Sequence, residues 1–471
     1  MFNTAPAAAM LEKQVKTHFL ARRLPLAFCA ATAAFALGGC SGMARQDQGI
    51  AQLVESRTGT RPPVAPDATA RQALRQDIAA LTAHPLDADT AVHIALLNNP
   101  SMLASYDEAG VAAADLEQAG RLQNPEFSFK RTHGDGQTFI ERGLTVNLLD
   151  VLTIPLAKRM EQRRYEATRL DIAQSAVTLA AQTRTAYFEA VAAKQAARYM
   201  GDAAAAADAS RDLARRMAAA GNWSRLDQAR QEAFDAATTN DAARAANTAQ
   251  VTAQKLARLL GLDDGAALHF PDTLPPLPEL PGDDIVSIDT AIQSRLDVQA
   301  AQQRSAWKAS DLGLTRATRF VQVLDLGAVQ NRNEGAARAP GYEINISVPL
   351  FDWGDAKTQR AEALYLQSAD SLAATVQDAA SDIRIARANR QHSYELAKRY
   401  RDDIIPLRRR IADETLLRYN GMLIGVFELL NDARAQIADT LGAIDAQKDY
   451  WIADAALQNA CGGLSPNKDT P

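Results

Sequence analysis

The sequence has few of the residues from which metal and cofactor sites are usually built. It contains three cysteines in 471 residues, and its six histidines occur singly. Two of the cysteines lie within the first 40 residues, so we expect no disulfide framework and no metal cluster. The sequence also lacks a nucleophile motif and a phosphate-binding loop. We therefore expect neither an enzyme nor a bound cofactor or metal.

Strong charge of one sign and long apolar runs are also lacking. With 51 basic and 56 acidic residues, the chain offers no basic field for a nucleic-acid partner. After the N-terminal region no run of about 18 apolar residues occurs, so no membrane-spanning helix is predicted. Aromatic residues make up only 6% of the chain, while alanine is abundant. This composition is typical of long or coiled-coil helices rather than of a compact α/β enzyme.

Residues 1–39 are predicted to form a lipoprotein signal peptide. An apolar stretch at 24–37 is shorter than the roughly 20 residues that a spanning helix needs. Its last residue begins Leu37-Gly38-Gly39-Cys40, which looks like a bacterial lipobox, so we expect Cys40 to be diacylated and to become the mature N-terminus. By analogy with other bacterial lipoproteins, Ser41 favours the outer membrane. Met10 is an alternative start, and an ordinary cleaved signal is the alternative reading. The basic residues before the apolar stretch are Lys13, Lys16, Arg22 and Arg23.

The chain resembles itself at a spacing close to 200 residues. Leu116-x-x-Ala119-x-Arg121-Leu122 matches Leu314-x-x-Ala317-x-Arg319-Phe320, and Gly221 corresponds to Gly421. Such similarity predicts a duplicated unit of helix, strand, strand, helix and helix. The predicted segments are a lipidated extended segment (40–85), a first repeat (86–262), a Pro-rich linker (263–285), a second repeat (286–460) and a disordered tail (461–471).

Each repeat is predicted to contain one very long helix that turns back on itself. The first helices are expected at 89–121 and 287–319. The long helices are expected at 155–220 and 353–418. At 1.5 Å per residue these reach about 100 Å, a length that only coiled-coil-like packing can stabilise. Breaks at Ala220-Gly221-Asn222 and Asn420-Gly421 should return the chain in helices that end near 260 and 459.

Four short strands complete the two repeats. Apolar and polar residues alternate at 342–350 and 144–148, with partner strands at 127–130 and 320–329 and connections at 131–139 and 330–341. This pattern is typical of a membrane strand around a wet lumen, but also of a half-buried sheet in a soluble protein. Four strands cannot close a barrel, whereas three chains would supply twelve.

Several motifs, taken in order, resemble the outer-membrane efflux protein (TolC-like) family. They are Arg295-Leu296-Asp297-Val298, Ser347-Val348-Pro349-Leu350-Phe351-Asp352-Trp353-Gly354, and Arg418-Tyr419-Asn420-Gly421 followed by Phe427-Glu428-Leu429-Leu430. The resemblance covers residues 89–459. It implies a mainly α fold with a small β part, in which a long helical barrel continues into a trimeric, twelve-stranded transmembrane β-barrel.

The resemblance also implies a function and a set of site residues. The chain would be a homotrimeric, lipid-anchored outer-membrane duct with its helical body in the periplasm, passively conducting small molecules or ions. Its partners would be a periplasmic membrane-fusion adaptor, an inner-membrane transporter of the resistance-nodulation-division type, and outer-membrane lipid. The implied adaptor-contacting turns hold Gly221, Asn222, Gly421 and Met422. The candidate gate residues are Asp227, Arg418, Tyr419, Glu428 and Asp432.

One departure from the family pattern and one alternative function stay open at this stage. Phe427-Glu428 lies one residue later after the glycine than is usual, which affects the register of the acidic residues. The alternative function is a periplasmic coiled-coil adaptor or scaffold lipoprotein. An adaptor should carry a lipoyl-like or small β-sandwich region with a single hairpin, so the duplicated unit argues against it. Metal ions, drugs and other small molecules all remain candidate cargo.

Overall fold

The structure, a computed structural model, describes residues 41–62, 68–134, 137–279, 287–320, 323–333, 335 and 337–463. The chain divides into two units, Met1–Gly49 and Ile50–Pro471. The predicted signal peptide, the lipidation site at Cys40, the linker residues 280–285 and the tail residues 464–471 lie outside the described residues. All that follows on packing concerns the second unit.

The N-terminal segment is helical, which corrects the prediction of an extended chain over 40–85. Helix α2 spans Ser41–Thr58 and helix α3 spans Ala68–Thr82. Ile50 and Val54, one helical turn apart, are fully buried in the main core, and Ile78 of α3 joins them there. The Gly, Pro and Thr residues that suggested an extended chain instead mark the end of α2. Burial of this apolar stripe therefore outweighs the local composition.

The two repeats have the same order of elements, as predicted. The first repeat contains α4 (Ala88–Asn98), α5 (Pro100–Ala119), β1 (Glu126–Gly134), β2 (Gln137–Asn147), α6 (Leu148–Ala219) and α7 (Arg225–Leu260). The second contains α8 (Ile288–Ser294), α9 (Leu296–Thr318), β3 (Leu324–Asn333), β4 (Ala339–Ile346), α10 (Asp355–Arg399), a π-helical segment (Tyr400–Ile404), α11 (Ile405–Asn420) and α12 (Val426–Ala460). Between them, the described linker residues hold one short 3-10 turn, Gly265–Ala267.

The first helix of each repeat is broken, although the sequence predicted single helices. In the first repeat the break falls at Asn99, whose side chain accepts hydrogen bonds from the N–H groups of Ser101 and Met102 and so begins α5. Pro100 follows as the first residue of α5, where its missing N–H costs nothing. In the second repeat the break falls at the corresponding place, Arg295. The duplication therefore extends to the interruption itself.

The long helices tolerate proline better than the sequence suggested. Helix α6 begins at Leu148, not near Pro155, because Asn147 caps it by accepting from the N–H of Asp150 at 2.9 Å. Pro155 then lies inside the helix. In the second repeat, Pro406 is the second residue of α11, which directly follows the π-helical segment Tyr400–Ile404. A π-helical turn is a common way for a helix to absorb a local disruption of its hydrogen bonds.

The four strands form one antiparallel sheet in the order β1-β2-β3-β4. They extend further toward their turns than predicted, so most of 131–139 and part of 330–341 is strand rather than connection. Conversely, β4 ends at Ile346 and not at 350. Ser347 still donates to the carbonyl of Val323 at 3.3 Å, but Pro349 has no N–H to continue the ladder.

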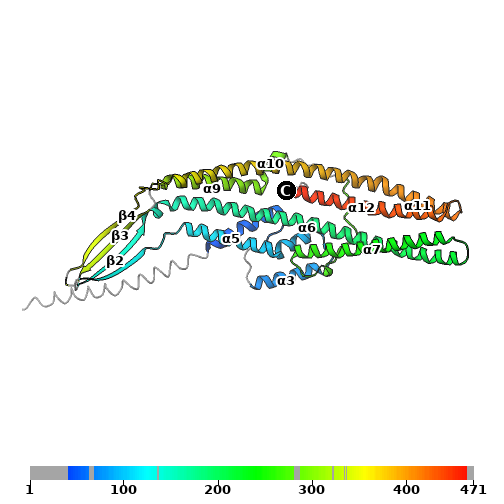
Figure 1. Cartoon of the computed structure of the whole chain (residues 1–471), viewed down its shortest axis with the longest axis horizontal. Helices are drawn as coiled ribbons and strands as arrows, with labels where there is room; N and C mark the ends of the chain where they lie inside the picture. Colours follow the sequence, from blue (N-terminus) through cyan, green and yellow to red (C-terminus); the bar gives the residue numbers. More distant parts are fainter. Residues whose placement is uncertain are drawn as a thin grey trace, which may run out of the picture. The chain divides into compact units, whose positions relative to one another are not determined.

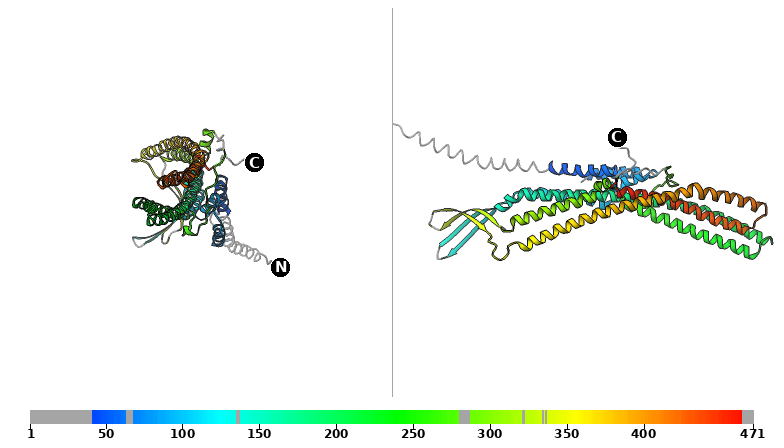
Figure 2. Two further views of the ribbon diagram at one scale, coloured as in Figure 1. Left: turned by 90° about the vertical axis from the view of Figure 1, so that its right-hand side faces the viewer. Right: turned by 90° about the horizontal axis from the view of Figure 1, so that it is seen from above.

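Within the second unit, the sheet and the two return turns lie at opposite ends (Figure 1). The turns between α6 and α7 and between α11 and α12 lie together at the end away from the strands, and the second view agrees (Figure 2). The main hydrophobic core lies between these ends, where the short helices pack on the middle of α6. Four fully buried leucines from three helices, α4, α7 and α9, meet there: Leu96, Leu256, Leu260 and Leu296.

Arg295 links the break between α8 and α9 to two other helices. Its guanidinium contacts Asp297 at 2.6 Å and Asp382 of α10 at 3.4 Å, and donates to the carbonyl of Ala460 at 3.1 Å. Desolvation by burial lowers its pKa, but the two carboxylates outweigh that effect and raise the pKa above the ordinary value. This gives a structural reason for the Arg-Leu-Asp-Val motif singled out in the sequence.

We expect Arg295→Met to lower the free energy of unfolding by about 3 kcal/mol, because it leaves Asp297 and a buried carbonyl without their partner. The measurement is the shift in the denaturation midpoint, followed by circular dichroism on the purified protein. Arg304→Met is the matched control, since it removes the exposed ion pair with Asp171 and should cost less than about 1 kcal/mol. Equal losses in the two variants would show that Arg295 has no such role.

Candidate functional site

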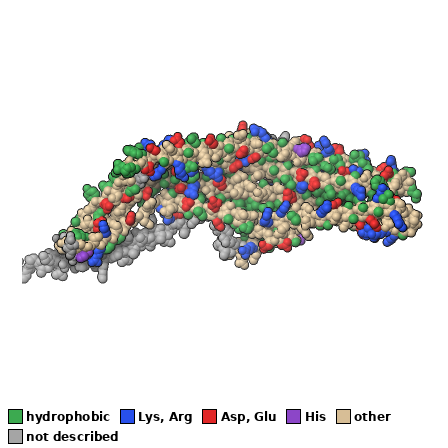
Figure 3. All heavy atoms as spheres, in the orientation of Figure 1, with side chains coloured by type: hydrophobic (Ala, Val, Ile, Leu, Met, Phe, Trp, Pro, Cys, Tyr) green, Lys and Arg blue, Asp and Glu red, His purple; other side chains and the backbone are tan. Residues whose placement is uncertain are grey.

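One face of the sheet is apolar and exposed. The large hydrophobic side chains on this face, hereafter the apolar face, include Tyr342 at 82% exposure and Phe127 at 66%. Figure 3 shows hydrophobic side chains gathered over the strand end of the visible surface. An exposed apolar surface of this extent is unusual in a soluble monomer. The other members are Phe129, Leu144, Val146, Leu326, Ile344 and Ile346.

The opposite face of the same sheet, the polar face, carries almost all of its acidic and amide side chains. Because side chains alternate along a strand, residues paired across the sheet share a face. Glu126, Thr145, Gly327 and Glu343 lie in one such row. Two positions on this face are glycines because a neighbouring side chain occupies the space. A Cβ at Gly143 would crowd Ser128, and a Cβ at Gly327 would crowd Thr145. Other members are Lys130, Glu141, Asp325, Asn331 and Asn345.

The two edges of the sheet have no strand partner among the described residues. β1 pairs only with β2, and β4 pairs only with β3. The sheet therefore combines an apolar face, a polar face and two free edges of unpaired backbone groups. In a soluble protein such edges are usually covered or interrupted.

The two return turns have the same length and geometry. Gly221 has φ +77°, and the residue in the same left-handed region of the second turn is Met422, with φ 59°. Gly421 instead has φ −77° and occupies the C-cap position that Ala220 occupies in the first turn. The repeat offset is therefore 201 here, not 200. This resolves the one-residue departure noted in the sequence, because Met422 takes a conformation that glycine normally supplies.

With this offset, Asp227 and Glu428 occupy equivalent positions. Each is the third residue of the helix that follows its turn. Ser224 caps α7: its hydroxyl accepts from the N–H of Asp227 at 3.1 Å and donates to the Asp227 carboxylate at 2.6 Å. Arg230 lies 3.5 Å from the same carboxylate. Glu428 is exposed in the first turn of α12, where a carboxylate is favoured by the helix dipole.

The other candidate gate residues are placed differently. Asp432 faces Arg408 within its own hairpin at 3.1 Å, and its side chain is only 11% exposed. The hydrogen bond that Arg408 donates to the Asp439 carboxylate is the main reason that the pKa of Arg408 is raised. Arg418 pairs with Glu414 one turn away at 2.9 Å, with both side chains more than half exposed. The structure thus brings Asp227 and Glu428 to the end of the molecule as equivalents, while Asp432 is engaged within a hairpin.

Two contacts between the hairpins were missed from the sequence. The Arg230 guanidinium of α7 lies 5.1 Å from the ring centre of Phe427 in α12, and Arg434 of α12 lies 5.1 Å from the ring centre of Phe234 in α7. Both are cation–π contacts, worth about 0.5–1 kcal/mol each at an exposed site. They join residues about 200 positions apart, so no local pattern could reveal them. They hold the two hairpins of one chain together near the turns.

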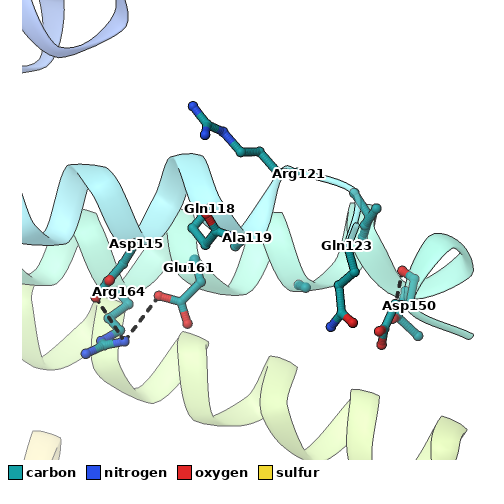
Figure 4. Close-up of a pocket in the computed structure, with 11 residues that line it drawn as sticks. Asp115, Gln118, Ala119, Arg121, Gln123, Asp150, Glu161 and Arg164 are labelled. Carbon is teal, nitrogen blue, oxygen red and sulfur yellow. Dashed lines mark hydrogen bonds and ion pairs between the residues drawn. The ribbon is translucent and has the colours of Figure 1, made fainter. Parts of the chain in front are cut away.

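One cleft away from the sheet and the turns is lined mainly by polar and charged side chains. The cleft in Figure 4, about 440 Å³, lies between α5 and the start of α6. In this cleft Arg164 forms ion pairs with Asp115 at 3.8 Å and with Glu161 at 3.4 Å. These charged side chains of the cleft are therefore paired with one another. Among the described residues, no group of three His, Cys, Asp or Glu side chains could hold a metal ion.

No described helix is both long enough and apolar enough to cross a membrane.

Comparisons with known proteins agree with this architecture. No family profile matches the chain. It is 27% identical to the protein CyaE of Bordetella pertussis over 341 residues. This alignment covers 64% of this chain and 70% of CyaE. The CmeC outer membrane channel of Campylobacter jejuni superposes with a TM-score of 0.72 at 16% identity, covering 81% of this chain and 87% of CmeC.

Two further solved channels give the same result. The outer-membrane channel OprN has a TM-score of 0.69 at 20% identity and covers 80% of this chain and 90% of its own. The open state of the Neisseria gonorrhoeae MtrE outer membrane channel has a TM-score of 0.65 at 19% identity, and the match covers 81% of this chain and 90% of MtrE. The chain therefore has the fold of the TolC-like outer-membrane efflux channels, which confirms the mainly α fold with a small β part predicted from the sequence motifs.

Proposed function

We propose that three copies of this chain form the outer-membrane exit duct of a tripartite efflux or secretion system. The duct would conduct small molecules or ions passively, without chemistry on its cargo. Twelve strands would form the membrane barrel and the paired helices a tube in the periplasm. Cys40, once diacylated, would add a lipid anchor to each copy.

The sheet is the observation that carries this proposal. Its apolar face suits hydrocarbon, its polar face suits a water-filled lumen, and its free β1 and β4 edges can pair with those of neighbouring copies. In lipid each unpaired backbone group costs several kcal/mol, so a single copy could not span the membrane with its edges open. A scaffold or adaptor lipoprotein would have no use for such a sheet.

The end with the two turns would dock to a periplasmic membrane-fusion adaptor, which connects the duct to an inner-membrane transporter of the resistance-nodulation-division type. Met422 is 93% exposed and Leu423 is 77% exposed, an apolar tip suited to a protein partner. Gly221, Asn222 and Gly421 would complete this contact. Arg418 and Tyr419 would contribute contacts between helices in the closed state.

The test is the size and conductance of the protein extracted from outer membranes. The full chain should purify in detergent as a trimer that resists dissociation until heated, and it should form water-filled pores in planar lipid bilayers. The same extraction without detergent is the control and should release none of the protein. A soluble monomer without pore activity would contradict the proposal.

A further inference from the structure

The apolar face of the sheet is graded along the strands. Each row consists of residues paired across the sheet, and successive rows are about 7 Å apart because they lie two residues apart along a strand. Nearest the helices the rows are aliphatic, with Val146, Leu326 and Ile344. The next row holds Phe127, Leu144 and Tyr342, and Phe129 follows. Closest to the strand turns the character changes to cationic.

Three arginines occupy this last part of the apolar face. Arg142 is paired with Phe129, while Arg131 and Arg332 both flank Ile140 in the next row. Arg131 and Arg332 are each diagonal to Arg142, and diagonal neighbours across a sheet are about 7–8 Å apart. The three guanidinium groups can therefore reach one ligand together. We call Arg131, Arg142 and Arg332 the arginine rim.

All three rim side chains are exposed, and none forms an ion pair with another residue that the structure describes. The four acidic residues of the described strands, Glu126, Glu141, Asp325 and Glu343, all lie on the polar face. Lys130, next to Arg131 in sequence, also lies on the polar face, where Glu141 is its cross-strand partner. The rim arginines and the strand carboxylates therefore lie on opposite faces of the sheet, even where they belong to the same strand.

The order aliphatic, aromatic, cationic matches the order of environments met on leaving a bilayer through its headgroups. Aromatic side chains favour the boundary, and arginines next to it reach outward to the polar groups. Guanidinium groups bind phosphate through paired, charge-assisted hydrogen bonds. Since the rim is continuous with the apolar face, a ligand with acyl chains can contact both at once.

We propose that the arginine rim binds the phosphate groups of phosphorylated glycolipid in the outer leaflet of the membrane. This rests on the proposed function, because it requires the apolar face to be the lipid-facing surface. Acyl chains of the glycolipid lie along the aromatic and aliphatic rows, and its phosphates contact the rim. Three copies would present nine arginines around the barrel.

The test compares the thermal dissociation of the purified full-length assembly with three additives: bisphosphorylated lipid A, fully dephosphorylated lipid A, and inorganic phosphate. The variant carries Arg131→Gln, Arg142→Gln and Arg332→Gln together, and Lys130→Gln is the matched control on the other face. We expect bisphosphorylated lipid A to stabilise the unchanged protein and the Lys130→Gln control alike. Its half-maximal concentration should rise at least roughly tenfold in the triple variant, because several charge-assisted contacts are lost.

A second triple variant, with lysine at the three rim positions, keeps the charge and should recover much of the response. An unchanged response in the glutamine variant, or equal stabilisation by dephosphorylated lipid A, would overturn the inference. Competition by equimolar inorganic phosphate would assign the rim to free anions instead. If the proposed function itself is wrong, the unchanged protein will form neither trimers nor pores, and this outcome differs from a failure of the rim alone. Normal pores with an identical lipid response in all variants would refute only the rim.

Discussion

Leu144→Arg is expected to prevent assembly in the outer membrane, whereas Thr145→Arg, one residue further along, should be tolerated. Leu144 lies on the apolar face between Phe127 and Ala328, and is 49% exposed in the single chain. A cationic side chain on the lipid face of a membrane barrel costs about 2–4 kcal/mol near the midplane. A trimer carries that cost three times, which is comparable to the whole stability of many proteins.

The control works because side-chain direction alternates strictly along a strand. Thr145 is paired with Glu126 and Gly327 on the polar face, so an arginine there would enter the proposed lumen. Heat-resistant trimer in outer-membrane fractions is the measurement for both variants. Assembly of Leu144→Arg at the level of Thr145→Arg would mean that the apolar face does not contact lipid, and would remove the main support for the duct.

The second large effect is expected at the two equivalent acids near the turns. Combining Asp227→Asn with Glu428→Gln should weaken block by multivalent cations about tenfold and raise the single-channel conductance. The physical reason is that three copies bring six carboxylates to one end of the duct, where cations would be concentrated and held. Currents across planar lipid bilayers, recorded with increasing concentrations of a trivalent cation, provide the measurement.

Asp241→Asn is the matched control for the gate variant. It removes an exposed carboxylate from the same helix as Asp227, 14 residues or about 21 Å further along. Its ion pair with Arg244 resembles the pair of Asp227 with Arg230. Block should be unchanged in this control. A gate variant that also blocks normally would exclude Asp227 and Glu428 as the cation-binding ring.

Local patterns located most of the elements but misplaced several boundaries. The return turns and the ends of α7 and α12 agree with the prediction, because glycine and a loss of helical pattern mark them directly. Pro155 misled, since an asparagine cap starts the helix seven residues before it. Pro406 was correctly placed inside a long helix, but the π-helical turn that precedes it was not predicted. The prediction for the N-terminal segment was wrong for another reason: Ile50 and Val54 become informative only when the rest of the main core is there to bury them.

The sequence predicted which residues belong to the candidate site, but not which positions of the two repeats are equivalent. The sequence identified Asp227 and Glu428 as acids after the turns, yet their equivalence depended on Met422 taking the left-handed conformation. Likewise the contacts of Arg230 with Phe427 and of Arg434 with Phe234 join distant segments. Asp432 looked similar to the other acids until the fold placed Arg408 opposite it.

By itself, the sequence determined the duplicated plan, the long helices and the alternation of the strands, because periodicity and turn residues act over a few neighbouring positions. Only the tertiary structure decided which strand residues share a row, and hence that, among the described strand residues, the arginines lie beside the apolar face and the acids on the other face. Cross-strand register depends on pairing between distant segments, as for Phe139 and Asn333, which are 194 positions apart, and a shift of one residue would move every side chain to the other face.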